Sequence, residues 1–130
     1  MAERRFPRNL RSLEPMVRFV ADYVGARGFD PEHSFTIDLL IEEIFTNMLK
    51  HGKGGGPDVS VGLAGEREEL VVTLRDFNVE PFDPTAQPGP GEGAGEGGLG
   101  LRLVRQISDS VRYEYKERSA IITLTKKFPL

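Results

Sequence analysis

The chain of 130 residues contains no cysteine and no tryptophan. Without cysteine, disulfides, thiolate nucleophiles and cysteine-ligated metals are excluded, so the fold depends on its hydrophobic core. No apolar run reaches the ~20 residues of a membrane span, and the first residues lack the apolar centre of a secretory signal. A net charge of -3 offers no basic surface to a nucleic acid. We therefore expect one cytoplasmic domain over residues 1–130, with neither a membrane nor a nucleic acid as its partner.

A second absence is local, because no lysine or arginine occurs between Arg75 and Arg102. Most of this interval is FNVEPFDPTAQPGPGEGAGEGG, residues 77–98, whose glycines and prolines predict a loop without regular structure. A loop longer than roughly 15 residues inside a compact domain is usually functional or disordered. The loop alone leaves both interpretations open.

The apolar pattern predicts three helices and four or five strands. Recurrence at three- and four-residue steps predicts helices over residues 12–27 and 30–51, the second with Asp30 as its cap and Pro31 at its first position. The other expected elements are a third helix over 99–109, strands over 58–65, 69–76, 110–117 and 120–128, and an edge strand over 4–7. This order favours an α+β fold, a two-layer α/β sandwich with the helices on one face of a mixed, mostly antiparallel sheet.

The last turns of the second helix, EEIFTNMLKHG, carry polar residues beside the apolar stripe. At about 100° per residue, Glu43, Asn47 and Lys50 fall on one flank of that stripe. An asparagine oxygen can ligate magnesium, and a carboxylate can accept a proton from a nucleophile. The alternative is a solvated helix flank with an ordinary side-chain pair.

Two features later in the chain favour a binding site. Asp76 ends a predicted strand, and an ionised carboxylate presents only acceptors, so it could accept a hydrogen bond from an adenine amino group. The glycines of GEGGLGLRLV run into a helix start, where backbone amides can approach phosphate oxygens. Taken singly, Asp76 could be a turn residue. Together with the helix flank, these features predict a nucleotide pocket.

These stretches, in this order, resemble the anti-sigma-factor serine/threonine kinases of the sporulation and stress-response type, within the GHKL group of ATPases that share the Bergerat fold. The resemblance covers nearly the whole chain. EEIFTNMLKHG resembles the family's asparagine box. The resemblance implies that Glu43 is the general base, that Asn47 is the magnesium ligand, and that Lys50 and His51 belong to the nucleotide site.

RDFNVEPFDP resembles the first glycine box of the family, and GEGGLGLRLVRQISDSV resembles the second. The first implies that Asp76 binds adenine, with Asn78 at a position where glycine is usual. Residues 77–98 then correspond to the ATP lid. The second implies phosphate contacts from the backbone of Gly95, Gly97, Gly98, Leu99 and Gly100.

The resemblance implies a kinase that uses ATP and Mg²⁺ to phosphorylate an anti-sigma-factor antagonist of the STAS type. It also implies a sigma factor as a second partner and a homodimer as an assembly. The cation-free lid and Asn78 favour an alternative, a nucleotide-binding module of little or no catalytic activity that sequesters a protein partner. A third interpretation, a detached histidine-kinase catalytic domain, would require a separate phosphoacceptor partner.

Overall fold

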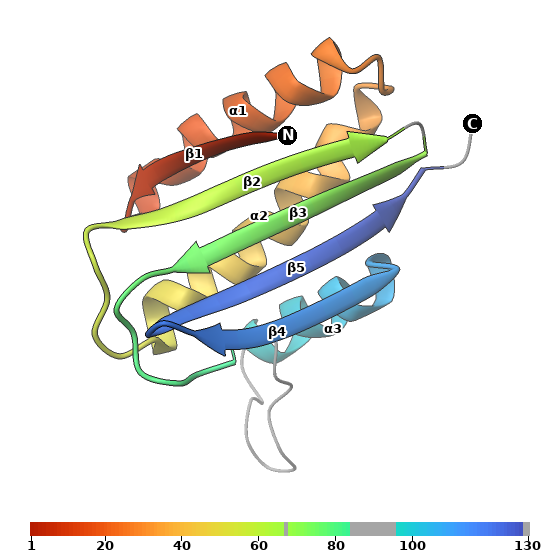
Figure 1. The fold of residues 1–130 in the computed structure, drawn as a ribbon. Coiled ribbons are helices and arrows are strands. Elements are labelled where there is room, and N and C mark those ends of the chain that lie inside the picture. Colours follow the sequence, from red (N-terminus) through yellow and green to blue (C-terminus); the bar gives the residue numbers. More distant parts are fainter. Residues whose placement is uncertain (67, 84–95, 129–130) are drawn as a thin grey trace.

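The computed structural model describes residues 1–66, 68–83 and 96–128 (Figure 1). The regular elements follow the predicted order and type. They are β1 (Ala2–Pro7), the short 3-10 helix η1 (Leu10–Ser12), α1 (Leu13–Ala26), α2 (Glu32–His51), β2 (Asp58–Glu66), β3 (Glu69–Asp76), α3 (Glu96–Ile107), β4 (Ser110–Lys116) and β5 (Ser119–Lys127).

The five strands form one sheet in the order β1-β2-β3-β5-β4, and all four pairings are antiparallel. The prediction of a mostly antiparallel sheet is confirmed. The expected parallel component is wrong for the described strands. After β3, the chain passes through α3 to β4, and the hairpin to β5 returns the chain between β3 and β4. Strands β3 and β4 run in the same direction, and β5 lies between them.

The helices cover one face of the sheet, and the core fills the layer between them (Figure 1). Strand β3 alternates between partly exposed and buried residues along its length, as a strand with one covered face should. The largest fully buried side chains come from both layers: Phe6, Met16, Ile37, Leu40, Ile44, Phe45, Met48, Leu63, Leu70, Leu74, Ile122 and Leu124. The two-layer sandwich predicted from the sequence is confirmed.

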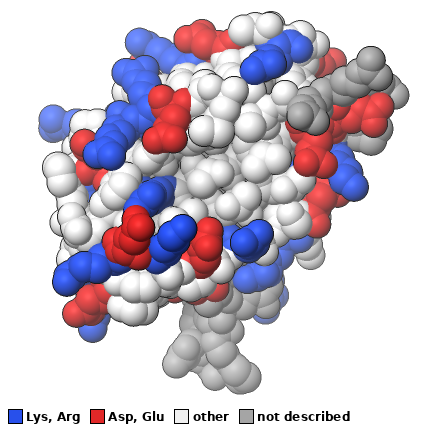
Figure 2. Space-filling model, viewed as in Figure 1, with Lys and Arg blue, Asp and Glu red and all other residues white. Residues whose placement is uncertain are grey.

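Among the described elements, none of the helices lies on the opposite face of the sheet (Figure 1). Its centre is uncharged, and lysine, arginine, aspartate and glutamate surround that centre (Figure 2). Within the described segments, no helix has both the length and the apolar character that crossing a membrane requires.

Two predicted boundaries need correction. The second helix begins at Glu32, so Pro31 precedes it, although Asp30 does cap it by accepting a hydrogen bond from the Glu32 amide at 2.9 Å. The third helix begins at Glu96, before the predicted start at residue 99, so the last three residues of the stretch expected to lack regular structure are helical. Glycine destabilises a helix mainly in its middle, so glycines in the first turn cost less. Residues 84–95 of the predicted lid lie outside the described residues.

Candidate nucleotide site

The last turns of α2 carry the predicted polar flank. Asn47 is buried, at 8% exposure, on the edge of the apolar stripe, and Glu43 is partly buried one turn earlier. Lys50 and His51 are exposed in the final turn. The helix therefore points a buried amide and a half-buried carboxylate in nearly the same direction, with a cation beside them.

The surroundings of Glu43 make its carboxylate more basic. Burial raises the pKa of Glu43 above the ordinary 4.5, the adjacent Glu42 raises it further, and Lys50 acts in the opposite direction. A carboxylate whose pKa lies closer to neutral pH is a better proton acceptor in general base catalysis.

Asp76 lies at the end of β3 and is 2% exposed. Arg8, which follows β1, donates from Nε to Asp76 Oδ1 at 3.0 Å and from Nη2 to Asp76 Oδ2 at 3.3 Å. The same Nη2 donates to the backbone carbonyl of Met48 in α2, also at 3.0 Å. The predicted base-binding carboxylate is thus bridged to the helix turn that carries Asn47.

The loop after β3 is tied to the segment that follows α2. Gly55 and Gly56 donate backbone hydrogen bonds to the carbonyls of Asn78 and Phe77, at 2.7 and 2.8 Å. Asn78 has a φ of 55°, the left-handed conformation that glycine and asparagine adopt most readily. Asparagine therefore forms a turn at the position where the sequence resemblance leads one to expect glycine. The ring of His51 lies 6.1 Å from that of Phe82, which brings the same loop against the end of α2.

The glycine-rich stretch coincides with the start of α3. Gly97, Gly98, Leu99 and Gly100 lie in its first turns, so their backbone amides are at a helix N-terminus. Helix α3 packs against α2. Gly95 lies outside the described residues.

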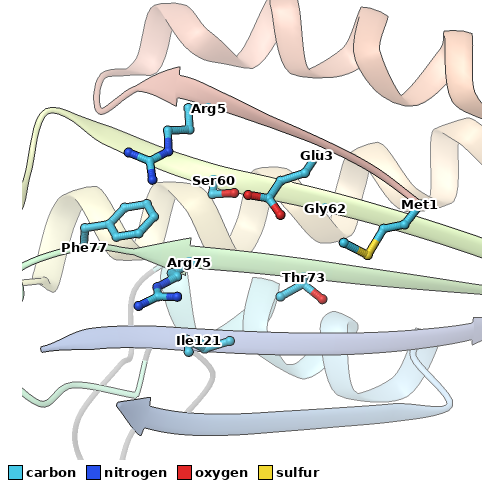
Figure 3. A pocket seen from close by; sticks show the side chains of 9 residues that line it. All are labelled: Met1, Glu3, Arg5, Ser60, Gly62, Thr73, Arg75, Phe77 and Ile121. Carbon is cyan, nitrogen blue, oxygen red and sulfur yellow. The ribbon is translucent and has the colours of Figure 1, made fainter. Parts of the chain in front are cut away.

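A pocket of about 250 Å³ occurs elsewhere, on the open face of the sheet (Figure 3). Its lining comes from β1, β2, β3, β5 and residues next to them, and it includes Arg5, Arg75 and Phe77, which follows β3. Both guanidinium groups lie over the Phe77 ring, at 4.6 and 4.9 Å from its centroid. None of the predicted site residues lines this pocket, so it is separate from the candidate nucleotide site.

Comparison with known proteins identifies the family. The family model for the histidine kinase-like ATPase domain matches residues 6–126. The chain belongs to this family. It is 30% identical over 122 residues to the serine-protein kinase RsbW of Halalkalibacterium halodurans, covering 87% of this chain and 74% of that protein. The resemblance to the RsbW-type kinases inferred from the sequence is therefore confirmed.

A solved structure shares the fold of this histidine kinase-like ATPase domain. The RsbU and RsbW domains of a Mycobacterium tuberculosis protein align with a TM-score of 0.64 and 15% identity. The alignment covers 99% of this chain but only 34% of that one, so the chain spans about a third of that protein's length. At this identity the likeness establishes the fold alone.

Sequence reasoning missed two residues that shape the site of this ATPase domain. Arg8 binds the Asp76 carboxylate across 68 residues of chain. Tyr115 in β4 donates its hydroxyl proton to the backbone carbonyl of Val79 at 2.7 Å, which holds the loop after β3 from the other side. An arginine just after a strand and a tyrosine on an edge strand have no periodic or motif signal, so neither could be found without the topology.

Proposed function

We propose that the protein binds ATP with magnesium in the cytoplasm and phosphorylates a serine or threonine of a STAS-type anti-sigma-factor antagonist, with a sigma factor as its other partner. The observation that carries this proposal is the juxtaposition of Asp76 with α2. A buried carboxylate at the end of β3 is connected through Arg8 to the Met48 carbonyl, next to Asn47. In such a nucleotide site, Asp76 would accept a hydrogen bond from the base, and α2 would lie beside the phosphates.

Glu43 is the proposed general base. It would accept the proton of the partner's hydroxyl as the oxygen attacks the terminal phosphate of ATP. The raised pKa of Glu43 supports this role, and so does its position one turn before Asn47 on the same flank.

Asn47 is the proposed magnesium ligand. Its amide oxygen is a hard donor of the type that magnesium prefers. The described residues contain no group of three histidine or acidic side chains that could hold a metal, so phosphate and water oxygens would supply the remaining ligands. Bound magnesium would neutralise the charge that develops on the phosphates.

Calorimetric titration with ATP, with and without magnesium, tests the proposal. We expect magnesium-dependent binding that Asn47→Ala loses and that Asn47→Asp, which retains an oxygen donor, partly restores. Thr46→Ala is the matched control, because Thr46 is the adjacent residue on a different side of α2. Absence of binding at millimolar ATP by the wild-type protein would contradict the proposal.

A second candidate is a nucleotide-binding module without kinase activity. It is favoured by the absence of lysine and arginine from residues 76–101, since phosphoryl transfer requires charge neutralisation at the terminal phosphate. Incubation with radiolabelled ATP and a STAS-type antagonist separates the two candidates. Label on the antagonist supports the kinase, whereas ATP binding with no transfer supports the module.

A further inference from the structure

The side chain of Arg8 is held in the candidate nucleotide site by hydrogen bonds to Asp76 and Met48. This side chain is 15% exposed. Its guanidinium group donates three hydrogen bonds, two to the Asp76 carboxylate and one to the Met48 carbonyl. Its own backbone amide donates to the carbonyl of Pro57 at 2.9 Å. Both the backbone and the guanidinium of Arg8 are therefore fixed.

Two glycines leave the space that this side chain fills. A Cβ on Gly55, whose φ is 114°, would lie 2.8 Å from Cζ and Nε of Arg8. A Cβ on Gly52 would lie 3.0 Å from Arg8 Nη2 and 3.5 Å from Asp76 Oδ2. A larger residue at position 55 would collide with the arginine, and one at position 52 would collide with the Met48 carbonyl, 2.6 Å away, to which Arg8 donates.

The chemistry of a buried carboxylate explains what Arg8 could contribute. An ionised carboxylate presents acceptors only, whereas a protonated one also presents a donor. A carboxylate in the interior without a cation tends to become neutral, because its charge is costly to bury. A paired guanidinium stabilises the ionised form and fixes both oxygens in one plane.

The two forms of the carboxyl group would bind different purines. Adenine has an amino group at position 6, which donates, and hypoxanthine has a carbonyl there, which accepts. An acceptor-only carboxylate favours the first and repels the second, and a neutral carboxyl group accommodates both. Sites built to pair one polar group discriminate strongly against an analogue that lacks it.

We propose that Arg8 is the positioning residue that makes Asp76 selective for 6-aminopurine nucleotides over 6-oxopurine nucleotides. This inference rests on the proposed function, in which Asp76 contacts the base. Arg8 acts through Asp76, by maintaining an acceptor-only carboxylate at a position that is 2% exposed.

The test compares the affinities for ATP and inosine triphosphate in wild-type, Arg8→Met and Arg8→Lys proteins. Arg8→Met removes the charge at similar length, and we expect the preference for ATP to fall roughly tenfold to a hundredfold, the range of a charge-assisted hydrogen bond. Arg8→Lys retains a cation and should retain most of the preference. If Arg8→Met does not fold, Arg8→Lys still tests the inference, because loss of the preference for ATP with a cation retained would contradict it.

Arg18→Met is the matched control. Arg18 pairs with Glu14 at 2.9 Å, but both side chains are exposed, at 75% and 77%. Replacing Arg18 with methionine should change neither the affinity for ATP nor the affinity for inosine triphosphate. Equal losses for both nucleotides in Arg8→Met would mean that Arg8 is merely structural. Tighter ATP binding in that variant would mean that Arg8 occupies the place of the base, and either result overturns the inference.

A separate variant distinguishes failure of this inference from failure of the proposed function. Asp76→Asn introduces an amide that can donate to a 6-carbonyl, so the preference should shift toward inosine triphosphate if Asp76 contacts the base. If wild-type protein binds neither nucleotide, the proposed function fails, and the role of Arg8 fails with it. If Asp76→Asn shifts the preference and Arg8→Met does not, only the role of Arg8 fails.

Discussion

Two acidic side chains of α2, Glu43 and Asp38, have raised pKa values, and they lie on different sides of the helix. They are five residues apart, which is about 140° around the axis. Burial raises both pKa values, and repulsion from the charge of Glu42 raises them further. The pKa of Asp38 reaches about 6. Only for Glu43 does a cation, Lys50, lower the pKa. Only Glu43 is followed one turn later by a buried amide, that of Asn47.

The comparison teaches that a raised pKa alone does not identify a catalytic base. Asp38 Oδ1 is buried and has no hydrogen-bond partner among the described residues. Its raised pKa is caused by burial and by Glu42, and the ionised form of Asp38 therefore lowers the stability of the folded protein. The assignment of Glu43 depends on its neighbours on α2, namely the buried Asn47 and the cation of Lys50.

The largest expected effect is on catalysis. Replacing Glu43 with glutamine should lower phosphoryl transfer by about 10² to 10⁴-fold, the usual contribution of a general base, while ATP affinity stays nearly unchanged. Single-turnover transfer to a STAS-type antagonist and calorimetry measure the two quantities. The matched variant Asp38→Asn should transfer phosphate at the wild-type rate. If Glu43→Gln lost affinity and transfer equally, the role of base would be wrong.

The next effect is on stability. Because the pKa of Asp38 is raised in the folded state, the folded protein binds this proton more tightly, and stability falls as pH rises from 3.8 through about 6. Asp38→Asn should therefore be more stable than wild type at pH 7, by about 1 kcal/mol after allowance for partial solvent screening. Denaturant unfolding at pH 4 and pH 7 measures this difference.

The control for that stability measurement is Asp22→Asn, since Asp22 is an exposed residue of α1. Its unfolding free energy at the two pH values measures the effect of removing an exposed carboxylate. A gain for Asp38→Asn that is equal at pH 4 and pH 7 would show that the titration of Asp38 is not its cause.

A smaller effect would come from Glu42, which raises both pKa values by charge repulsion. Glu42→Gln should lower the pKa of Asp38 and that of Glu43 together, and burial should keep both above their ordinary values. Carbon-detected NMR titration of the two carboxyl groups follows both in one sample. Movement of only one of them would mean that Glu42 faces only one side of the helix.

The smallest expected effect is a change in the pKa of Glu43 that does not occur at Asp38. Lys50 lowers the pKa of Glu43 and is not among the causes for Asp38. Lys50→Met should raise the pKa of Glu43 alone, and the difference from wild type should shrink as salt is added, because Lys50 is exposed. The same NMR titration at two salt concentrations tests this. An equal change at Asp38 would contradict the assignment of Lys50 to one flank.

Periodicity was sufficient to predict most of this fold. The alternation of apolar residues in β2 and β3 and the apolar stripe of α2 are local signals. These elements form mainly because their apolar residues are buried in the core. Asn78 was predictable as a turn residue because few side chains tolerate its φ. The start of α3 was wrong because glycine was weighed as a helix breaker at positions where it costs little.

The contacts that complete the candidate site were not predictable in this way. Arg8 and Asp76 become neighbours only because β1 pairs with β2 and β2 with β3, and neither residue has a pattern that indicates the other. The unpaired oxygen of Asp38 was missed for a similar reason, since its cost depends on what packs around it.

The position of β5 has a consequence for how the domain assembles during synthesis. The last strand of the described chain is an interior strand, and β4 pairs in the sheet with β5 alone. Until β5 has left the ribosome, β3 and β4 both have an unpaired edge, and unpaired edges are prone to join other chains. The nascent chain therefore needs the residues of β5 before this sheet is complete. A truncation that removes β5 would separate β4 from the rest of the sheet, which loss of the edge strand β1 would not do.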